Sequence, residues 1–214
     1  MALVAALALG LAAVGAAPAV DELESVERAR LDAGEVVVRT RPVADFPWPE
    51  VTAYRRVRAT PAEVMAVYGD FGSQTRWVPE LVASRILARE APNIFRVFYE
   101  YEVTGPNERY TVTITVARAG DGFDARWRLL EARYARRLAG EIRVRPSAAG
   151  SVVIYTNRVD PGSIGIAFGT PSAIVRRLVA TVEGLAKRVE HLVATEPAVL
   201  GHLVQALYVT VGSP

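Results

Sequence analysis

Apolar and polar residues alternate with a period of two through the middle of the chain, which is the pattern of antiparallel strands. In the segment 108–118, apolar residues at every second position are separated by threonines. A strand there would present all of its apolar side chains on one face. Turns rich in Gly, Pro and Asn follow such segments and favour hairpins. We predict further strands at 35–41, 51–59, 81–89, 94–103, 123–129, 134–145 and 151–159.

The alternation indicates a sheet with one polar face, so that the apolar face needs a cover. In 151–159 the pattern is ambiguous, because Val152 and Ile154 compete with Val153 and Tyr155 for the inward positions. The sequence therefore leaves open which of these side chains face the core.

A long amphipathic helix is predicted at 171–195, opened by Pro171 and ended before Pro197. Its apolar residues recur at steps of three and four. They are Ile174, Leu178, Val182, Leu185, Val189 and Leu192. This helix is the only predicted element large enough to cover the sheet. The sequence thus predicts an α+β fold in which a curved antiparallel β-sheet wraps around a long C-terminal helix.

Shorter elements complete the chain. Thr60-Pro61-Ala62-Glu63 is a helix start with a capping box, and we predict short helices at 61–68 and 73–77. A charged segment at 21–33 favours a helix. The apolar tail at 198–211 is expected to form a short helix or strand that packs on the sheet, with docking on a membrane surface as the alternative.

Three patterns carry a resemblance to a known superfamily. They are ATPAEVMAVYGD leading to RWVPEL (59–81), the run of hairpins, and Asp160-Pro161-Gly162-Ser163-Ile164 before the last helix. In this order they resemble the helix-grip fold of the START/Bet v 1-like superfamily, also called SRPBCC, with its polyketide cyclase and coenzyme Q-binding branches. The resemblance spans 51–196. It implies a cavity between sheet and helix that holds lipids, sterols, quinones or polyketides.

The N-terminus has the features of an export signal. An apolar run from Leu3 to Val14 is followed by Ala17-Pro18-Ala19, a small-residue cleavage pattern, although no Lys or Arg precedes the run. We expect a signal peptide at 1–19, an N-terminal helix and strand extension at 20–50, the helix-grip domain at 51–196 and an apolar tail at 197–214. The protein is expected to be periplasmic or secreted.

Composition narrows the possible chemistry. The chain of 214 residues has no Cys and two His, and its formal net charge is +2. The lack of Cys excludes disulfides, thiolate nucleophiles and iron–sulfur clusters. The small net charge argues against a nucleic-acid partner. We expect no metal and no cofactor, and the sequence does not define an oligomeric state.

The candidate ligand site is aromatic. Tyr and Trp combine an apolar body with a polar group, which suits a greasy ligand with one hydroxyl or carbonyl, although the same residues can simply fill a core. The candidates on the inward strand faces and beside the short helices are Trp77, Tyr99, Tyr101, Tyr110, Trp127 and Tyr155, with Tyr134 as a further possibility.

Three other candidates rest on position. Asn157, near the end of the last strand, can hydrogen-bond a ligand or be an ordinary polar strand end. Arg136 falls on the apolar parity of its strand, where it can pair with a ligand carboxylate or Glu131, unless a strand-end bulge exposes it. Phe168 lies in a Gly-rich link that can act as a mobile gate or be an ordinary loop.

These features favour a carrier that binds a hydrophobic small molecule without covalent chemistry, with transient contact to a membrane surface. The alternative is a cyclase, dehydratase or hydrolase in the same cavity. Such an enzyme needs an inward acid–base pair, and the strand patterns reveal none. A third reading is a regulatory or assembly module that uses the outer sheet face or the tail.

Overall fold

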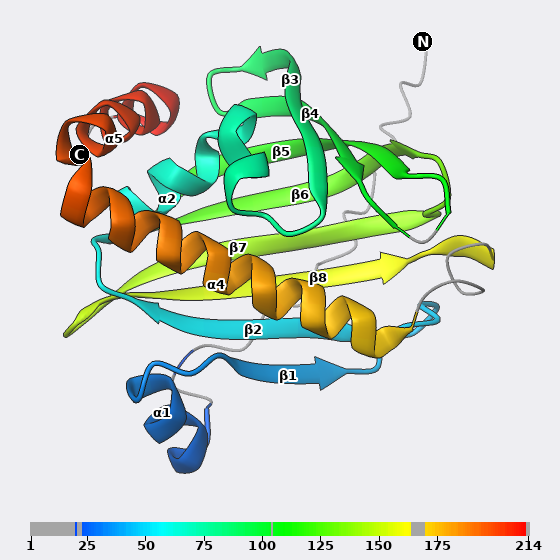
Figure 1. Cartoon of the computed structure of the whole chain (residues 1–214), viewed down its shortest axis with the longest axis horizontal. Coiled ribbons are helices and arrows are strands. Elements are labelled where there is room, and N and C mark those ends of the chain that lie inside the picture. Colours follow the sequence, from blue (N-terminus) through cyan, green and yellow to red (C-terminus); the bar gives the residue numbers. More distant parts are fainter. Residues whose placement is uncertain (1–19, 21–22, 104, 164–169, 213–214) are drawn as a thin grey trace, which may run out of the picture.

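Eight antiparallel strands form one curved sheet in the computed structural model, which describes residues 20, 23–103, 105–163 and 170–212. The strand order is β1-β2-β8-β7-β6-β5-β4-β3. The strands are β1 Val37–Arg41, β2 Glu50–Val57, β3 Leu81–Ala91, β4 Ile94–Tyr101, β5 Glu108–Ala119, β6 Gly122–Ala132, β7 Arg137–Ser147 and β8 Gly150–Asp160. The sheet curves around a long helix (Figure 1), so the predicted α+β helix-grip architecture is confirmed.

The chain brings its last strand back beside its second strand. Strands β3 to β8 follow one another as hairpins, and β8 then pairs with β2, for example Asn157 with Val51. The tight turn between β5 and β6 needs Gly120, whose φ of 62° lies in the left-handed region that favours glycine. This is the hairpin that the alternating pattern predicts.

Four helices and a short 3₁₀ helix complete the described fold. They are α1 Ser25–Asp32, α2 Pro61–Gly69, η2 Phe71–Arg76, α4 Pro171–Thr195 and α5 Pro197–Val211. The start of α2 is the predicted capping box: the Thr60 hydroxyl accepts from the Glu63 amide at 3.3 Å, and the Glu63 carboxylate accepts from the Thr60 amide at 2.7 Å. The second short helix is 3₁₀ and begins at Phe71, two residues before the predicted start.

Helix α4 has the predicted bounds and lies across the concave face of the sheet, while α2 and η2 cover the other part of that face (Figure 1). The predicted apolar stripe of α4 is buried from Leu178 to Leu192, and Ile174 in its first turn is half-buried. Gly184 sits where α4 meets the end of η2. A Cβ at this position would lie 2.1 Å from the Trp77 carbonyl oxygen, so the close approach of the two elements requires glycine.

A second, smaller core lies on the opposite face of the sheet. There α1 packs over β1, β2 and β8. This core consists of Leu23, Leu31, Val37, Tyr54, Val152 and Ile154. Val153 and Tyr155 instead belong to the main core beneath α4. Both faces of β8 are therefore covered by apolar groups, which explains why its sequence shows no clear parity.

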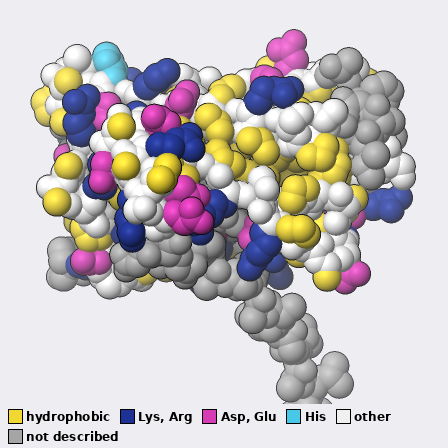
Figure 2. All heavy atoms as spheres, turned by 90° about the horizontal axis from the view of Figure 1, so that it is seen from below, with side chains coloured by type: hydrophobic (Ala, Val, Ile, Leu, Met, Phe, Trp, Pro, Cys, Tyr) yellow, Lys and Arg dark blue, Asp and Glu magenta, His cyan; other side chains and the backbone are white. Residues whose placement is uncertain are grey.

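The predicted tail is helical. Helix α5 turns away from α4 by 119° and packs against α2. Among the described residues, no single helix is long and apolar enough to cross a membrane, although α4 and α5 together have the length and composition. Seen from below, hydrophobic side chains gather at the end of the molecule where α4 begins, and charged ones are interspersed at the other end (Figure 2).

Candidate functional site

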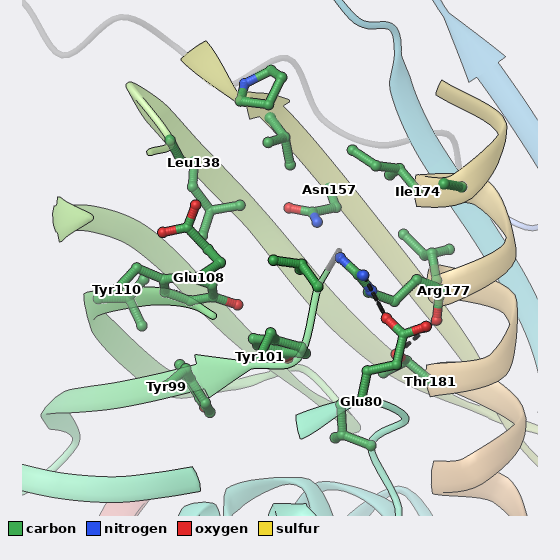
Figure 3. Close-up of a pocket in the computed structure, with 18 of the residues that line it drawn as sticks. Glu80, Tyr99, Tyr101, Glu108, Tyr110, Leu138, Asn157, Ile174, Arg177 and Thr181 are labelled. Carbon is green, nitrogen blue, oxygen red and sulfur yellow. Dashed lines mark hydrogen bonds and ion pairs between the residues drawn. The ribbon is translucent and has the colours of Figure 1, made fainter. Parts of the chain in front are cut away.

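A cavity of about 930 Å³ lies between α4, η2 and the concave face of the sheet. Pockets of roughly 300–1,000 Å³ hold drug-sized ligands, so the space suits one lipid-like molecule. Exposed residues mark its mouth beside the first turns of α4: Glu80, Glu102, Thr170 and Arg176. The sheet and helix therefore enclose a hollow in place of a filled core at this end of the molecule (Figure 3).

Three tyrosines from adjacent strands form one wall of the cavity. Tyr99 and Tyr101 project from β4, and Tyr110 projects from β5 directly opposite Tyr99. The ring centroids of Tyr101 and Tyr110 lie 5.7 Å apart in a stacked arrangement, and those of Tyr99 and Tyr110 lie 5.6 Å apart. The period of two places these rings on one face, and Figure 3 shows them on the same side of the cavity.

Trp127 and Tyr155 form a second aromatic group deeper in the cavity. Their ring centroids are 5.0 Å apart, and the Trp127 ring lies 6.5 Å from that of Tyr68 on α2. Gly140 on β7 pairs with Trp127. A Cβ at position 140 would lie 2.4 Å from Cζ2 of the indole. Glycine at this position therefore leaves room for the indole beside β7.

Burial raises the pKa of five cavity tyrosines above the ordinary value, because a phenolate would lose its hydration; they are Tyr68, Tyr99, Tyr101, Tyr110 and Tyr155. The Tyr101 and Tyr110 hydroxyls face each other, and the Tyr99 hydroxyl faces the polar side chains of Ser84 and Gln74. At physiological pH these groups are neutral phenols. They can donate a hydrogen bond to a ligand, but they are poor bases.

The charged residues of the cavity lie toward its mouth. Arg177 on α4 donates from Nε to Oε2 of Glu80 at 2.7 Å, and its guanidinium carbon lies 5.7 Å from the Tyr101 ring centroid. Figure 3 shows this pair joining α4 to the start of β3. The Glu108 carboxylate accepts from the backbone amides of Arg133 and Tyr134 at 3.2 and 3.3 Å. Both acids therefore have structural partners.

No Asp, His or Lys occurs among the described residues that line the cavity. Within the described ranges, no group of His, Asp and Glu residues is arranged to hold a metal ion. The lining acids are Glu80, Glu102 and Glu108, of which the first two are exposed. The arrangement is suited to enclosing an apolar molecule.

Seven of the nine predicted site residues line the cavity: Trp77, Tyr99, Tyr101, Tyr110, Trp127, Tyr155 and Asn157. Tyr134 lines it as well. Phe168 lies outside the described residues, so its role as a gate stays a prediction.

Arg136 is the exception, because the structure places it outside the cavity. It is exposed, and its Nη2 donates to the Ser163 hydroxyl at 3.2 Å. Strand β7 begins only at Arg137, so the parity that would direct Arg136 inward does not extend to it. Glu131, the suggested partner, instead accepts from the Thr111 hydroxyl at 3.0 Å.

Several lining residues escaped the strand-based reasoning because they come from helices and connections. Tyr68 and Gln74 enter from α2 and η2, Arg177 from α4, and Trp48 from the connection between β1 and β2. One signal was available for Arg177. It lies three residues after Ile174 and therefore on nearly the same side of the helix.

The fold and cavity define a helix-grip protein with an internal aromatic pocket, a fold that binds hydrophobic ligands. The chain belongs to the polyketide cyclase / dehydrase and lipid transport family, whose sequence profile matches residues 49–190. This confirms the suspected superfamily. No match was found among curated proteins.

Solved structures show the same fold. A STAR-related lipid transfer protein from Xanthomonas axonopodis is 22% identical, with a TM-score of 0.63, over 72% of this chain and 93% of that one. Human StAR-related lipid transfer protein 5 is 14% identical, with a TM-score of 0.62, over 74% and 83%. The Zhui aromatase/cyclase from Streptomyces sp. R1128 is 20% identical, with a TM-score of 0.55, over 73% and 96%. At these identities the likeness shows the fold alone.

Proposed function

We propose that the protein binds a hydrophobic small molecule, such as a lipid, sterol or quinone-like compound, and carries it without changing it covalently. The observation that carries this proposal is the aromatic hollow of about 930 Å³ beneath α4. Its deep walls are neutral phenols and apolar side chains, whereas its acids lie toward the mouth. A ligand can therefore be held by burial and oriented by a few hydrogen bonds.

The expected affinity follows from the area that a ligand buries. A lipid-like ligand that buries about 500 Å² of apolar surface gains roughly 12 kcal/mol at 25 cal/mol per Å². Lost translational and rotational freedom offsets about 4 kcal/mol or more of this. The balance corresponds to a dissociation constant of about 1 μM. This affinity is suitable for a carrier that must also release its ligand.

We also propose that the carrier is exported and exchanges ligand by transient contact with a membrane surface. The support is the apolar N-terminal run with its small-residue cleavage pattern, and the low solubility of apolar ligands in an aqueous compartment. N-terminal sequencing of protein from the periplasmic or culture fraction tests export. A mature chain that begins at Val20 is expected, and an uncleaved chain in the cytoplasm contradicts the proposal.

The second candidate is a cyclase, dehydratase or hydrolase that acts on a hydrophobic substrate in the same cavity. The family description and the similarity to an aromatase/cyclase favour it. The site chemistry counts against it, because general acid–base catalysis works best with a pKa near the operating pH. Burial moves the pKa of Tyr110 and Tyr155 away from that range.

Native mass spectrometry of the purified protein tests the carrier proposal. We expect a co-purified apolar molecule that is released unchanged and is lost in Thr181→Phe, because Thr181 lines the cavity from α4. Thr210→Phe is the matched control. Each threonine donates to the carbonyl four residues earlier, at 2.8 and 2.9 Å, but Thr210 lies on α5 outside the cavity. Occupancy that survives Thr181→Phe contradicts the site, and turnover of a bound molecule supports the enzyme.

A further inference from the structure

The polar groups of the cavity fall into two classes. The Tyr99, Tyr101 and Tyr110 hydroxyls each face another polar side chain of the protein. On β8 the situation differs. The Asn157 Oδ1 atom is buried, yet no described residue donates a hydrogen bond to it. A buried acceptor without a donor costs folding free energy, so this atom is a candidate for contact with a ligand.

Tyr155 lies two positions before Asn157 on the same face of β8. No hydrogen bond joins its hydroxyl to another residue in the described part of the chain. Residues two apart on a strand are separated by about 7 Å. One oxygen that is hydrogen-bonded on both sides joins groups about 5.5 Å apart. A shared ligand oxygen therefore requires the two side chains to lean toward each other. Figure 3 shows Asn157 across the cavity from Tyr99, Tyr101 and Tyr110, on the side of Leu138 and Ile174.

These two groups, which have no hydrogen-bond partner among the described residues, discriminate between ligands by the kind of oxygen group that the ligand carries. The Asn157 carbonyl oxygen accepts a hydrogen bond, and the Tyr155 phenol can donate one. An alcohol or phenol oxygen satisfies both, because it donates and accepts. A ketone, quinone or ester oxygen only accepts, and a hydrocarbon does neither. Discrimination of this kind is strong when a buried polar group of the site is left unpaired by the wrong ligand.

The charges of the cavity disfavour an anionic ligand. Its described lining contains three carboxylates, Glu80, Glu102 and Glu108, against the guanidinium groups of Arg176 and Arg177. Glu80 already pairs with Arg177, and Arg176 is exposed and lies 3.4 Å from the Ser172 hydroxyl. A carboxylate or phosphate in the deep part of the cavity would be a buried charge without a free cationic partner.

We propose that the ligand is an uncharged amphiphile with one hydroxyl group, which binds with that hydroxyl between Tyr155 and Asn157 and its apolar body against Trp127 and the tyrosine wall. This inference rests on the proposed function and specifies the chemistry of its ligand. The proposal excludes lipids with a phosphate or carboxylate group as ligands of this cavity.

Three fluorescent probes of equal size test the inference: 1-pyrenebutanol, 1-butylpyrene and 1-pyrenebutyric acid at pH 7. We expect 1-pyrenebutanol to bind about tenfold more tightly than either of the others. Asn157→Leu should abolish that preference by weakening the alcohol about tenfold and leaving 1-butylpyrene unchanged. Tyr155→Phe should weaken the alcohol alone by a smaller factor. Tyr208→Phe on α5, outside the cavity, is the matched control and should change nothing.

Thermal unfolding separates a ligand contact from a structural role. Leu at position 157 removes an unpaired buried acceptor, so ligand-free Asn157→Leu should unfold at the same temperature as the native chain or higher. Equal affinities for the alcohol and the hydrocarbon, or tighter binding of the acid, overturn the inference and leave the carrier function standing. Failure of all three probes to bind overturns the carrier function as well.

Discussion

Replacement of Trp127 by Ala tests whether the deep aromatic group belongs to the ligand site. The indole is buried, with 8% of its surface exposed, and packs against Tyr155 and Tyr68. Truncation of a buried Trp to Ala in a filled core costs about 3–5 kcal/mol. Trp127 borders a hollow, so we expect the lower limit of about 3 kcal/mol. A domain with a stability of roughly 5–15 kcal/mol then stays folded.

The effect on binding comes from lost ring contact. A ligand that loses roughly 60 Å² of apolar contact loses about 1.5 kcal/mol, which is about tenfold in affinity. Titration with 1-pyrenebutanol measures this loss, and circular dichroism should show unchanged helix content.

Phe123→Ala is the control for the Trp127 variant. Phe123 is a buried aromatic residue on the same face of β6, but it packs near Tyr208 and does not line the cavity. It should lose comparable stability and keep the affinity of the native chain. Unchanged affinity in Trp127→Ala, or an equal loss of affinity in Phe123→Ala, would refute the reasoning.

Three further predictions concern the mouth, the helix contact and pH. Arg177→Ala breaks the half-exposed ion pair with Glu80 and should cost less than about 1 kcal/mol of stability. The same variant should release 1-pyrenebutanol faster in a stopped-flow experiment. An unchanged release rate contradicts a role of Arg177 at the mouth of the cavity. Gly184→Ala places a Cβ 2.1 Å from the Trp77 carbonyl oxygen and should lower stability by about 1–3 kcal/mol in urea titration; a neutral result would mean that η2 can shift. Burial raises the pKa of Tyr68, Tyr99, Tyr101, Tyr110 and Tyr155, so the unfolded chain loses these protons first as pH rises. Between neutral pH and about pH 10 the ionisation of these tyrosines should leave stability unchanged, and above about pH 10 stability should fall. Phenolate absorbance from them should appear together with unfolding; their ionisation in the folded protein contradicts this.

The sequence alone determined the architecture of this protein, because local and repeating patterns specify it. The bounds of α4 follow from Pro171, Pro197 and an apolar stripe at helical spacing. The hairpins follow from the alternation and turn residues, and the start of α2 from its capping box. The three tyrosines on β4 and β5 were predictable for the same reason, since a strand directs every second side chain to one face.

Only the tertiary structure decided what the two faces of β8 contact and where the site is open. The parity of β8 depends on α1 and α4 covering opposite faces, which are contacts between segments far apart in sequence. Arg136 lies outside the cavity because β7 begins one residue later, and Arg177 lines it because α4 lies across the sheet. The hollow itself depends on the spacing between layers. No periodic pattern encodes that spacing, because a filled core and a lined cavity use the same apolar positions.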